Sequence, residues 1–328
     1  MIVHADDFGI TASQARAILD LSSACGGQGA LNSVSIFANS PAFEEAAALA
    51  RPFVGKARFD GNGTDVIGDE PRRTVPGLAI GLHVNLVEGP CCADPALIPL
   101  LVDGRGMFRN DFVRLLLMAA GPKKGALRSQ VETECGAQID RFLKQFPELR
   151  LHLHLDSHQH VHAIPVIFEA MLSAAKSRGA QVTRLRIPSE PLAPHRRCGT
   201  LELAGVANRG KAALLTALCH RIRANVPSGC ATPVFCGVVL SGNMSRITGE
   251  LANAFEDEAH CFAAMQAERD CRALAQDDDR VEMLFHPVSV PVVQCLDPKN
   301  ASFALACASP ERDAEAETIR RLSAELGA

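Results

Sequence analysis

Short apolar segments alternate with amphipathic helical segments along the whole chain, and this alternation restricts the fold more than any other feature. A strand followed by a helix and another strand is typical of a parallel sheet with crossover helices. The alternation therefore predicts an α/β protein whose sheet is either open or closed into a barrel. The expected strands are residues 1–5, 31–39, 78–86, 149–156, 182–188, 234–242 and 281–288. The expected helices are residues 11–26, 40–50, 107–143 with a break near Gly121-Pro122, 164–179 and 309–326.

The composition fits a single globular domain over residues 1–328. Hydrophobic residues make up 47% of the chain and charged residues 21%, which provides enough apolar material for a large core. The net charge of -4 and the lack of a Lys/Arg run argue against nucleic acid as a partner. No apolar segment is long enough for membrane insertion.

The first expected strand begins at Met1, which leaves no room for a signal peptide, and the 12 cysteines are scattered. We therefore expect reduced thiols and a cytoplasmic location. One segment interrupts the alternation, because residues 55–77 are rich in Gly, Pro and charged side chains. This composition predicts a loop or lid inserted between a helix and a strand.

Polar side chains gather at the ends of four expected strands. Asp6 and Asp7 follow the first strand, His83 ends the third, a run of histidines follows the fourth, and His286 ends the last. Taken singly, each has a structural explanation, such as a helix N-cap or a hydrogen-bonded core histidine. Because the carboxyl ends of parallel strands build active sites, the four together predict one site on one rim of the sheet.

The histidine run HLHLDSHQHVH covers residues 152–162 and places five imidazoles and Asp156 at alternate positions. Alternate residues of a strand face the same side of the sheet. The chain has only 11 histidines, and imidazole is the commonest metal ligand among side chains. The run therefore predicts a metal site, with a polar strand face of hydrogen-bonded histidines as the structural alternative.

Five motifs together carry a resemblance to a known family. The segments ADDFG, GLHVNLVEG, HLDSHQHVH and RIPSEP and the late HPV resemble the YdjC-like family, and the similarity extends from the first residues to SPERDAEAETIR. That family includes chitooligosaccharide deacetylases and deacetylases associated with hopanoid synthesis. The resemblance implies a single distorted TIM-like barrel with fewer than eight regular strands. It also implies removal of the acetyl group from an N-acetylated amino sugar with the help of a divalent metal ion.

Matching positions imply particular ligands for that ion. The resemblance makes Asp7, His83 and His158 the ligands of one divalent metal ion. Two imidazoles and one carboxylate suit Zn, Mn, Fe or Co, and usage in the family adds Mg, so that Mg and Zn are the first choices. On chemical grounds, the ion would also compensate the two adjacent carboxylates at the end of the first strand.

The resemblance also implies the groups that move protons. Asp6 would be the general base, His286 the acid on the other side of the site, and Arg186 the residue that orients the base carboxylate. We expect His286 to titrate near the ordinary pKa of an imidazole. Further candidates for substrate contact are Asn85, His160, His162 and Glu190.

Two departures from the family pattern concern the shape of the site. Residues 55–77 lengthen the gap between Asp7 and His83, and the late motif reads HPV, without the glycine that usually follows HP. The chain also has no Trp or Tyr to stack on sugar rings, so we expect a short substrate. Alternatives are another metal-dependent hydrolase resembling a phosphoesterase, or a non-catalytic sugar-binding homologue. The oligomeric state stays open, with a homodimer as one alternative.

Overall fold

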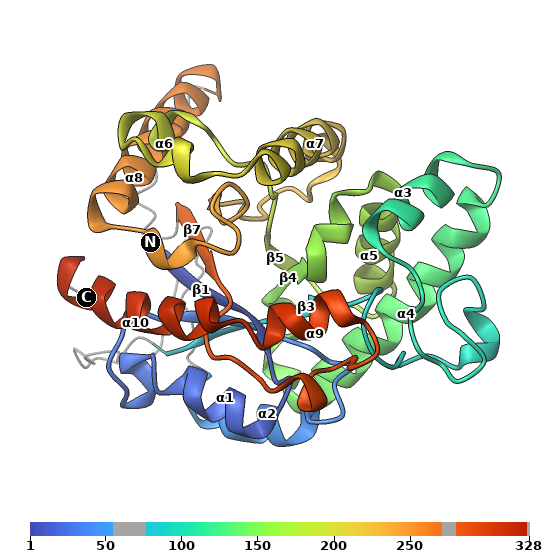
Figure 1. The fold of residues 1–328 in the computed structure, drawn as a ribbon. Helices are drawn as coiled ribbons and strands as arrows, with labels where there is room; N and C mark the ends of the chain where they lie inside the picture. The colour runs from blue at the N-terminus through green and yellow to red at the C-terminus, as the bar shows by residue number, and fades with distance from the viewer. Residues whose placement is uncertain (55–76, 271–279, 327–328) are drawn as a thin grey trace, which may run out of the picture.

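A curled sheet of seven parallel strands forms the centre of the molecule, and helices surround it (Figure 1). The computed structural model describes residues 1–54, 77–270 and 280–326. The strand order is β5-β4-β3-β2-β1-β7-β6. The predicted α/β class with a parallel sheet is therefore confirmed. The strands are β1 (Ile2–Phe8), β2 (Ser33–Ile36), β3 (Ala79–Val84), β4 (Leu153–Ser157), β5 (Val182–Leu185), β6 (Val234–Cys236) and β7 (Val281–Phe285).

The two edges of the sheet meet at one isolated bridge. Arg184 of β5 pairs in parallel with Ala231, which precedes β6. The backbone N–H of Leu185 donates to the carbonyl of Ala231 at 2.9 Å, and the N–H of Ala231 donates to Thr183 at 2.8 Å. The sheet is thus a curled half-barrel with a short link across its open side, which is consistent with a distorted barrel.

Helices cover the outside of the sheet, so the strands are buried on both faces and are mainly apolar. The expected helix over residues 107–143 is divided at Gly121, as its sequence predicts. The helices are α1 (Ala12–Leu19), α2 (Phe43–Ala50), α3 (Phe112–Ala120), α4 (Lys124–Gln145), α5 (Pro165–Ser177), α6 (Ala193–Arg197), α7 (Val206–Ile222), α8 (Gly249–Asp270), α9 (Ala301–Cys307) and α10 (Pro310–Glu325).

The sheet order brings the first and last strands together. Strand β1 lies between β2 and β7, with Ile2 opposite Glu282 and Ala5 opposite Phe285. Because all the strands are parallel, the carboxyl ends of β1, β3, β4 and β7 lie on the same side of the sheet. The last strand therefore lies beside the first.

The histidine run departs from the predicted strand. Residues Pro147–Leu151 form a 3₁₀ turn, so β4 starts at Leu153 and ends at Ser157. The chain then enters a second 3₁₀ segment, in which Gln159 and His160 have φ values of 53° and 59°. The prediction of one alternating strand face is therefore wrong beyond Ser157, because this turn points the later histidines in different directions.

The expected loop or lid falls almost entirely outside the described residues, since these exclude 55–76. Among the helices that the structure describes, we find none with the length and hydropathy needed to cross a membrane.

Candidate metal centre

The end of β1 turns sharply, and this turn brings two neighbouring aspartates to one site. Asp7 has a φ of 58°, and the pairing of β1 with β2 shifts register between Ala5 and Phe8. Left-handed backbone costs an L-residue about 1–2 kcal/mol, so the turn needs support. Gln14 of α1 provides it, because its Nε2 donates to the Asp7 carbonyl at 3.0 Å and its Oε1 accepts from Gly9 and Ile10.

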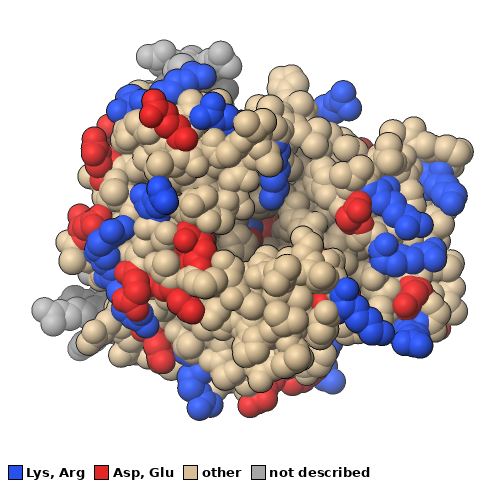
Figure 2. Space-filling model, viewed as in Figure 1, with Lys and Arg blue, Asp and Glu red and all other residues tan. Residues whose placement is uncertain are grey.

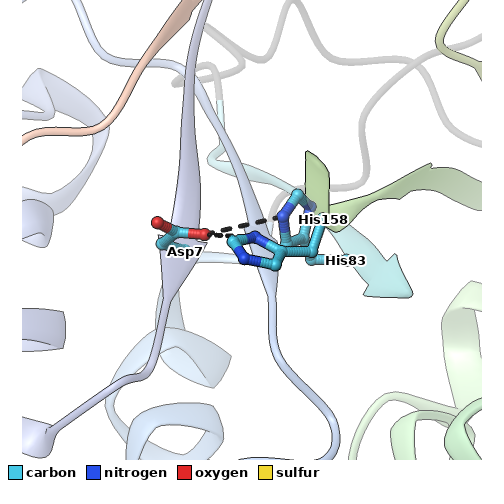
Figure 3. Close-up of side chains that lie close together, drawn as sticks. All are labelled: Asp7, His83 and His158. Atoms are coloured by element: carbon cyan, nitrogen blue, oxygen red, sulfur yellow. Dashed lines mark ion pairs between the residues drawn. The ribbon is translucent and has the colours of Figure 1, made fainter. Parts of the chain in front are cut away.

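Asp7, His83 and His158 converge from the ends of three strands (Figure 3). Oδ1 of Asp7 lies 3.6 Å from Nε2 of His83 and 3.1 Å from Nδ1 of His158. All three side chains are buried. Ligands of a tetrahedral ion held at about 2.1 Å would lie about 3.4 Å apart, so the spacing is that of a metal shell.

His83 is oriented by a carboxylate behind it. Its Nδ1 lies 2.5 Å from Oδ1 of Asp156 and 3.1 Å from the hydroxyl of Ser35. With Nδ1–H donating to Asp156, the lone pair of Nε2 faces Asp7. A carboxylate–histidine pair of this kind fixes the tautomer and increases the basicity of a metal ligand. Asp156 had no assigned role from the sequence, although it lies within the histidine run.

The donor atoms of this group fit a divalent ion. Within the described residues, Oδ1 of Asp7 and Nε2 of His83 are buried without a hydrogen-bond partner. His158 also has a buried, unpartnered Nε2, while its Nδ1 is the nitrogen that faces Asp7. Such atoms are costly unless another group satisfies them. One carboxylate and two imidazoles leave coordination positions open for water or substrate, as in catalytic sites. The predicted ligand set is thus a structurally suitable metal site, while the identity of the metal stays a prediction.

Asp6 is held by an arginine from a distant strand end. Nη1 and Nη2 of Arg186 donate to its two carboxylate oxygens at 2.7 and 2.8 Å, and Ser35 donates to Oδ1 at 3.0 Å. Burial opposes ionisation, but Arg186 and His83 hold the pKa of Asp6 well below its usual range. Asp6 is therefore an oriented carboxylate beside the candidate metal ligands.

Asp7 has an arginine of its own, which the sequence analysis missed. Nη2 of Arg312, on α10, donates to Oδ2 of Asp7 at 2.6 Å, and both residues are buried. Burial opposes ionisation, but Arg312 and His158 hold the pKa of Asp7 well below its usual range. Arg186 and Arg312 therefore provide positive charge to the two aspartates in addition to that of any bound metal ion.

His286 follows β7 and lies in a loop that is bonded to α10. Its backbone N–H donates to Glu315, and the N–H of Val288 donates to the carbonyl of Arg312 at 3.0 Å. Val288 has a φ of 71°, a left-handed conformation that glycine adopts without strain. It stands directly after His286-Pro287, where the family pattern has a glycine. Burial lowers the pKa of His286 to about 4, in contrast to the expected ordinary value.

A cavity of 590 Å³ opens over this group, and the molecular face in Figure 2 is hollowed near its centre, between α7 and α9. Most of its lining residues have polar side chains. The lining residues are Asp6, Asp7, Glu88, Asp111, His158, Gln159, His160, Lys211, Gly237, Ser241, Gly242, His286, Asn300, Ser302, Phe303, Ala306, Ser309, Glu311, Arg312 and Glu315.

The four candidates for substrate contact occupy different places. His160 lines the cavity, and its Nδ1 is buried without a partner among the described residues. Asn85, His162 and Glu190 do not line it, and each is hydrogen-bonded within the protein. Asn85 accepts from Val87 and Glu88, His162 contacts Ser157 and the Arg186 carbonyl, and Glu190 contacts His195 and the N–H groups of Val238 and Val239. All three side chains therefore have partners within the protein, and their contact with substrate stays a prediction.

Known proteins with similar sequences include carbohydrate deacetylases. A carbohydrate deacetylase from Mus musculus is 30% identical over 267 residues, covering 78% of this chain and 72% of that protein. A carbohydrate deacetylase from Geobacillus stearothermophilus is 31% identical, covering 60% and 62%. A chitooligosaccharide deacetylase from Escherichia fergusonii is 30% identical, covering 55% and 56%.

This chain matches only part of the length of each of these relatives. It spans 50% of a carbohydrate deacetylase from Danio rerio and 55% of one from Brevibacillus brevis. Among solved structures, a candidate cellobiose-phosphate cleavage protein from Enterococcus faecalis V583 matches with a TM-score of 0.53 at 18% identity. That match covers 99% of this chain and 93% of the other, and at this identity it supports the fold alone.

The family model described as YdjC-like protein matches residues 1–321, which is nearly the whole chain. The chain therefore belongs to the YdjC-like family.

Proposed function

We propose that this protein is a metal-dependent hydrolase that removes the acetyl group from an N-acetylated amino sugar. The observation that carries the proposal is the buried cluster of Asp7, His83 and His158, in which Oδ1 of Asp7 and Nε2 of His83 face each other without a hydrogen-bond partner among the described residues, with the oriented carboxylate of Asp6 beside it. The names of the deacetylase relatives supply the substrate class. In the reaction, the oxygen of water joins the acyl carbon and the C–N bond breaks, which yields acetate and a free amine.

The protein's own residues would move the two protons. A bound divalent ion would supply a Lewis acid and a more acidic water. Asp6 is ionised and held by Arg186, so it can accept the proton of the attacking water. His286, from the neighbouring strand end, would deliver a proton to the leaving nitrogen. Because its pKa is about 4, His286 is neutral near pH 7 and must first receive a proton, for which the proton that Asp6 takes from the attacking water is the source.

The cavity supports a short, polar substrate. Its lining consists mainly of carboxylate, amide, hydroxyl and imidazole groups, which suit the hydroxyl groups of a sugar. Phe303 is the single Phe, Tyr or Trp side chain in that described lining, so it offers little aromatic surface for a long oligosaccharide. We therefore expect a monosaccharide, a disaccharide or a sugar conjugate, with His160 as a residue that contacts it.

A phosphoesterase would need cations to bind phosphate. The described cavity lining contains two cationic side chains, Lys211 and Arg312, and Arg312 is already paired with Asp7. This favours deacetylation over phosphate-ester hydrolysis. A non-catalytic sugar-binding protein would not need a carboxylate like that of Asp6, which Arg186 holds in place beside the candidate metal ligands.

The test is acetate release from N-acetylglucosamine and its di- and trisaccharide, with and without a chelator, followed by addition of Zn²⁺, Mg²⁺, Mn²⁺, Co²⁺ or Fe²⁺. We expect release that stops with the chelator and returns with one of these ions. Phosphate release from sugar phosphates, or sugar binding without any acetate release, would support the alternative functions instead.

A further inference from the structure

Most residues that line the cavity have polar side chains, and two residues contribute a small patch of apolar side chain. Apart from two glycines, its apolar lining residues are Phe303 and Ala306. They are three positions apart on α9 and therefore lie on the same face of the helix. An apolar surface in a polar cavity suits a ligand that carries one small apolar group.

The patch lies beside one candidate metal ligand, His158, and is linked to a second, Asp7, through Arg312. The ring of Phe303 meets the ring of His158 edge to face, with centroids 5.0 Å apart. The carbonyl of Ala306 accepts a hydrogen bond from Nε of Arg312 at 3.0 Å, and the same guanidinium holds Asp7. The apolar surface is therefore close to the position where a carbonyl carbon would react.

An N-acetylated amino sugar has one methyl group, which is attached to the carbonyl carbon that is attacked. On the basis of the proposed function, we propose that Phe303 and Ala306 form the pocket for this methyl group and determine the length of the acyl chain that the site accepts. Formyl and acetyl groups fit such a pocket, whereas propionyl and butyryl groups would collide with the Phe303 ring.

Phe303 is held in place by a helix cap at its backbone and by apolar packing of its side chain. Its backbone N–H donates to the capping side chain of Asn300, and Nδ2 of Asn300 donates to both oxygens of Glu88 at 2.9 and 3.0 Å. The ring itself is only 6% exposed and belongs to a separate apolar cluster. The cluster consists of Ile10, Phe37, Val290, Cys295, Leu296, Phe303, Ala304 and Cys307.

A different use of Phe303 would be to stack on the sugar ring. Both uses predict that loss of the ring weakens substrate binding. The two uses differ in whether the effect of losing the ring depends on the acyl group. If the ring stacks on the sugar, its loss should weaken the binding of acetylated and butyrylated sugars equally. Selectivity between acyl groups therefore decides between them.

The first experiment measures binding without turnover. The dissociation constants of formate, acetate, propionate and butyrate are determined by calorimetry for the Zn²⁺-loaded protein and its variants. Phe303→Ala enlarges the pocket, Phe303→Leu is a milder change in case the alanine variant does not fold, and Ala306→Leu fills the pocket. Phe262→Ala is the matched control, because Phe262 is 42% exposed and lies on α8.

We expect the wild-type protein to prefer acetate over butyrate at least tenfold, and Phe303→Ala to reduce that preference at least tenfold. One methylene group in an apolar pocket changes selectivity by about 10–200-fold. Ala306→Leu should shift the preference from acetate towards formate, while Phe262→Ala should leave the series unchanged. An unchanged acetate-to-butyrate ratio in both Phe303 variants would overturn the proposal.

The second experiment separates this proposal from the proposed function. The same variants are assayed for acid release from chitobiose that carries N-acetyl or N-butyryl groups. If neither sugar is hydrolysed but the acid series responds to Phe303, the acyl pocket stands and the sugar assignment fails. If the acetylated sugar is hydrolysed and the Phe303 variants lower kcat/KM equally for both sugars, deacetylation stands and the acyl pocket is refuted.

Discussion

Arg312 donates a hydrogen bond to one oxygen of Asp7, and the other oxygen of Asp7 faces His83 and His158. The two partners are 305 positions apart in the sequence, and both are buried. The carboxylate is thus shared between a permanent cation on α10 and the candidate metal position. We infer that Arg312 keeps Asp7 compensated when no ion is bound.

The first prediction concerns this shared carboxylate. Arg312→Gln should destabilise the metal-free protein by about 3–5 kcal/mol, because the change leaves a buried carboxylate without its partner. Zn²⁺ then supplies the missing charge, so its addition should raise the Tm more in the variant than in the wild-type protein. Thermal unfolding with and without Zn²⁺ measures both effects.

The matched control for this change is Arg320→Gln, because Arg320 is 41% exposed on the same helix and pairs only with Glu317 among the described residues. It should change neither the metal-free stability nor the response to Zn²⁺. Equal Zn²⁺-induced shifts in Arg312→Gln and the wild-type protein would show that Arg312 does not compensate Asp7.

The second prediction concerns the residue behind His83. Asp156→Asn retains the shape of the side chain but removes the carboxylate that accepts from Nδ1 of His83. The affinity for Zn²⁺ should fall about 10–100-fold, the usual effect of losing the hydrogen-bond partner of a metal ligand. Competition with a chromophoric chelator measures this affinity. A variant that folds and binds Zn²⁺ as tightly as the wild-type protein would contradict the assignment of His83 as a ligand through Nε2.

The parallel sheet and the gathering of Asp7, His83 and His158 could be anticipated from the sequence, because the pattern of strands and helices places strand ends on one rim. The contact of Arg186 with Asp6 was anticipated from the family resemblance alone. The contact of Arg312 with Asp7 was not anticipated. Arg312 lies on α10, and the pattern of strands does not indicate that this helix lies near β1. A buried arginine in an otherwise polar helix gives no signal until the fold brings it to its partner.

The histidine run shows where periodicity fails. Alternation predicts that the histidines through His162 share one face, but Gln159 and His160 adopt left-handed backbone, which no pattern of side chains reveals. The turn sends His160 into the cavity and leaves His162 behind it, bonded through both ring nitrogens to Ser157 and Arg186. Equal spacing in the sequence therefore did not mean equal roles.

The third prediction concerns the missing glycine after HP. Val288→Gly should change the free energy of unfolding by less than about 1 kcal/mol, because relief of left-handed strain, about 1–2 kcal/mol, offsets the lost side chain and the flexibility of glycine. Val290→Gly is the comparison, because Val290 is buried and has no positive φ. This change should lower the free energy of unfolding several times more than Val288→Gly does. Urea unfolding of both variants measures the difference, and equal losses would mean that Val288 is not strained.

The last prediction concerns the two proton transfers. Asp6→Asn should retain the metal and lose on the order of 10²–10⁴ in kcat, the usual range for general acid–base catalysis. His286→Ala should also retain the metal, because His286 is not one of the three candidate ligands. Metal analysis of both purified variants, together with acetate release, provides the measurement.

The low pKa of His286 fixes the direction of its pH effect. With a pKa of about 4, the imidazole is neutral near pH 7 and gains a proton only as the pH falls towards 4. A general acid works in its protonated form, so the part of the rate that depends on His286 should fall as the pH rises above about 4, and His286→Ala should flatten this alkaline-side decline while lowering the rate. An ester substrate adds a sharper test, because an alkoxide leaves with less help than an amine. If His286→Ala slows ester and amide hydrolysis equally, His286 does not protonate the leaving group, and His160, whose Nδ1 is buried and unpartnered among the described residues, becomes the next residue to test.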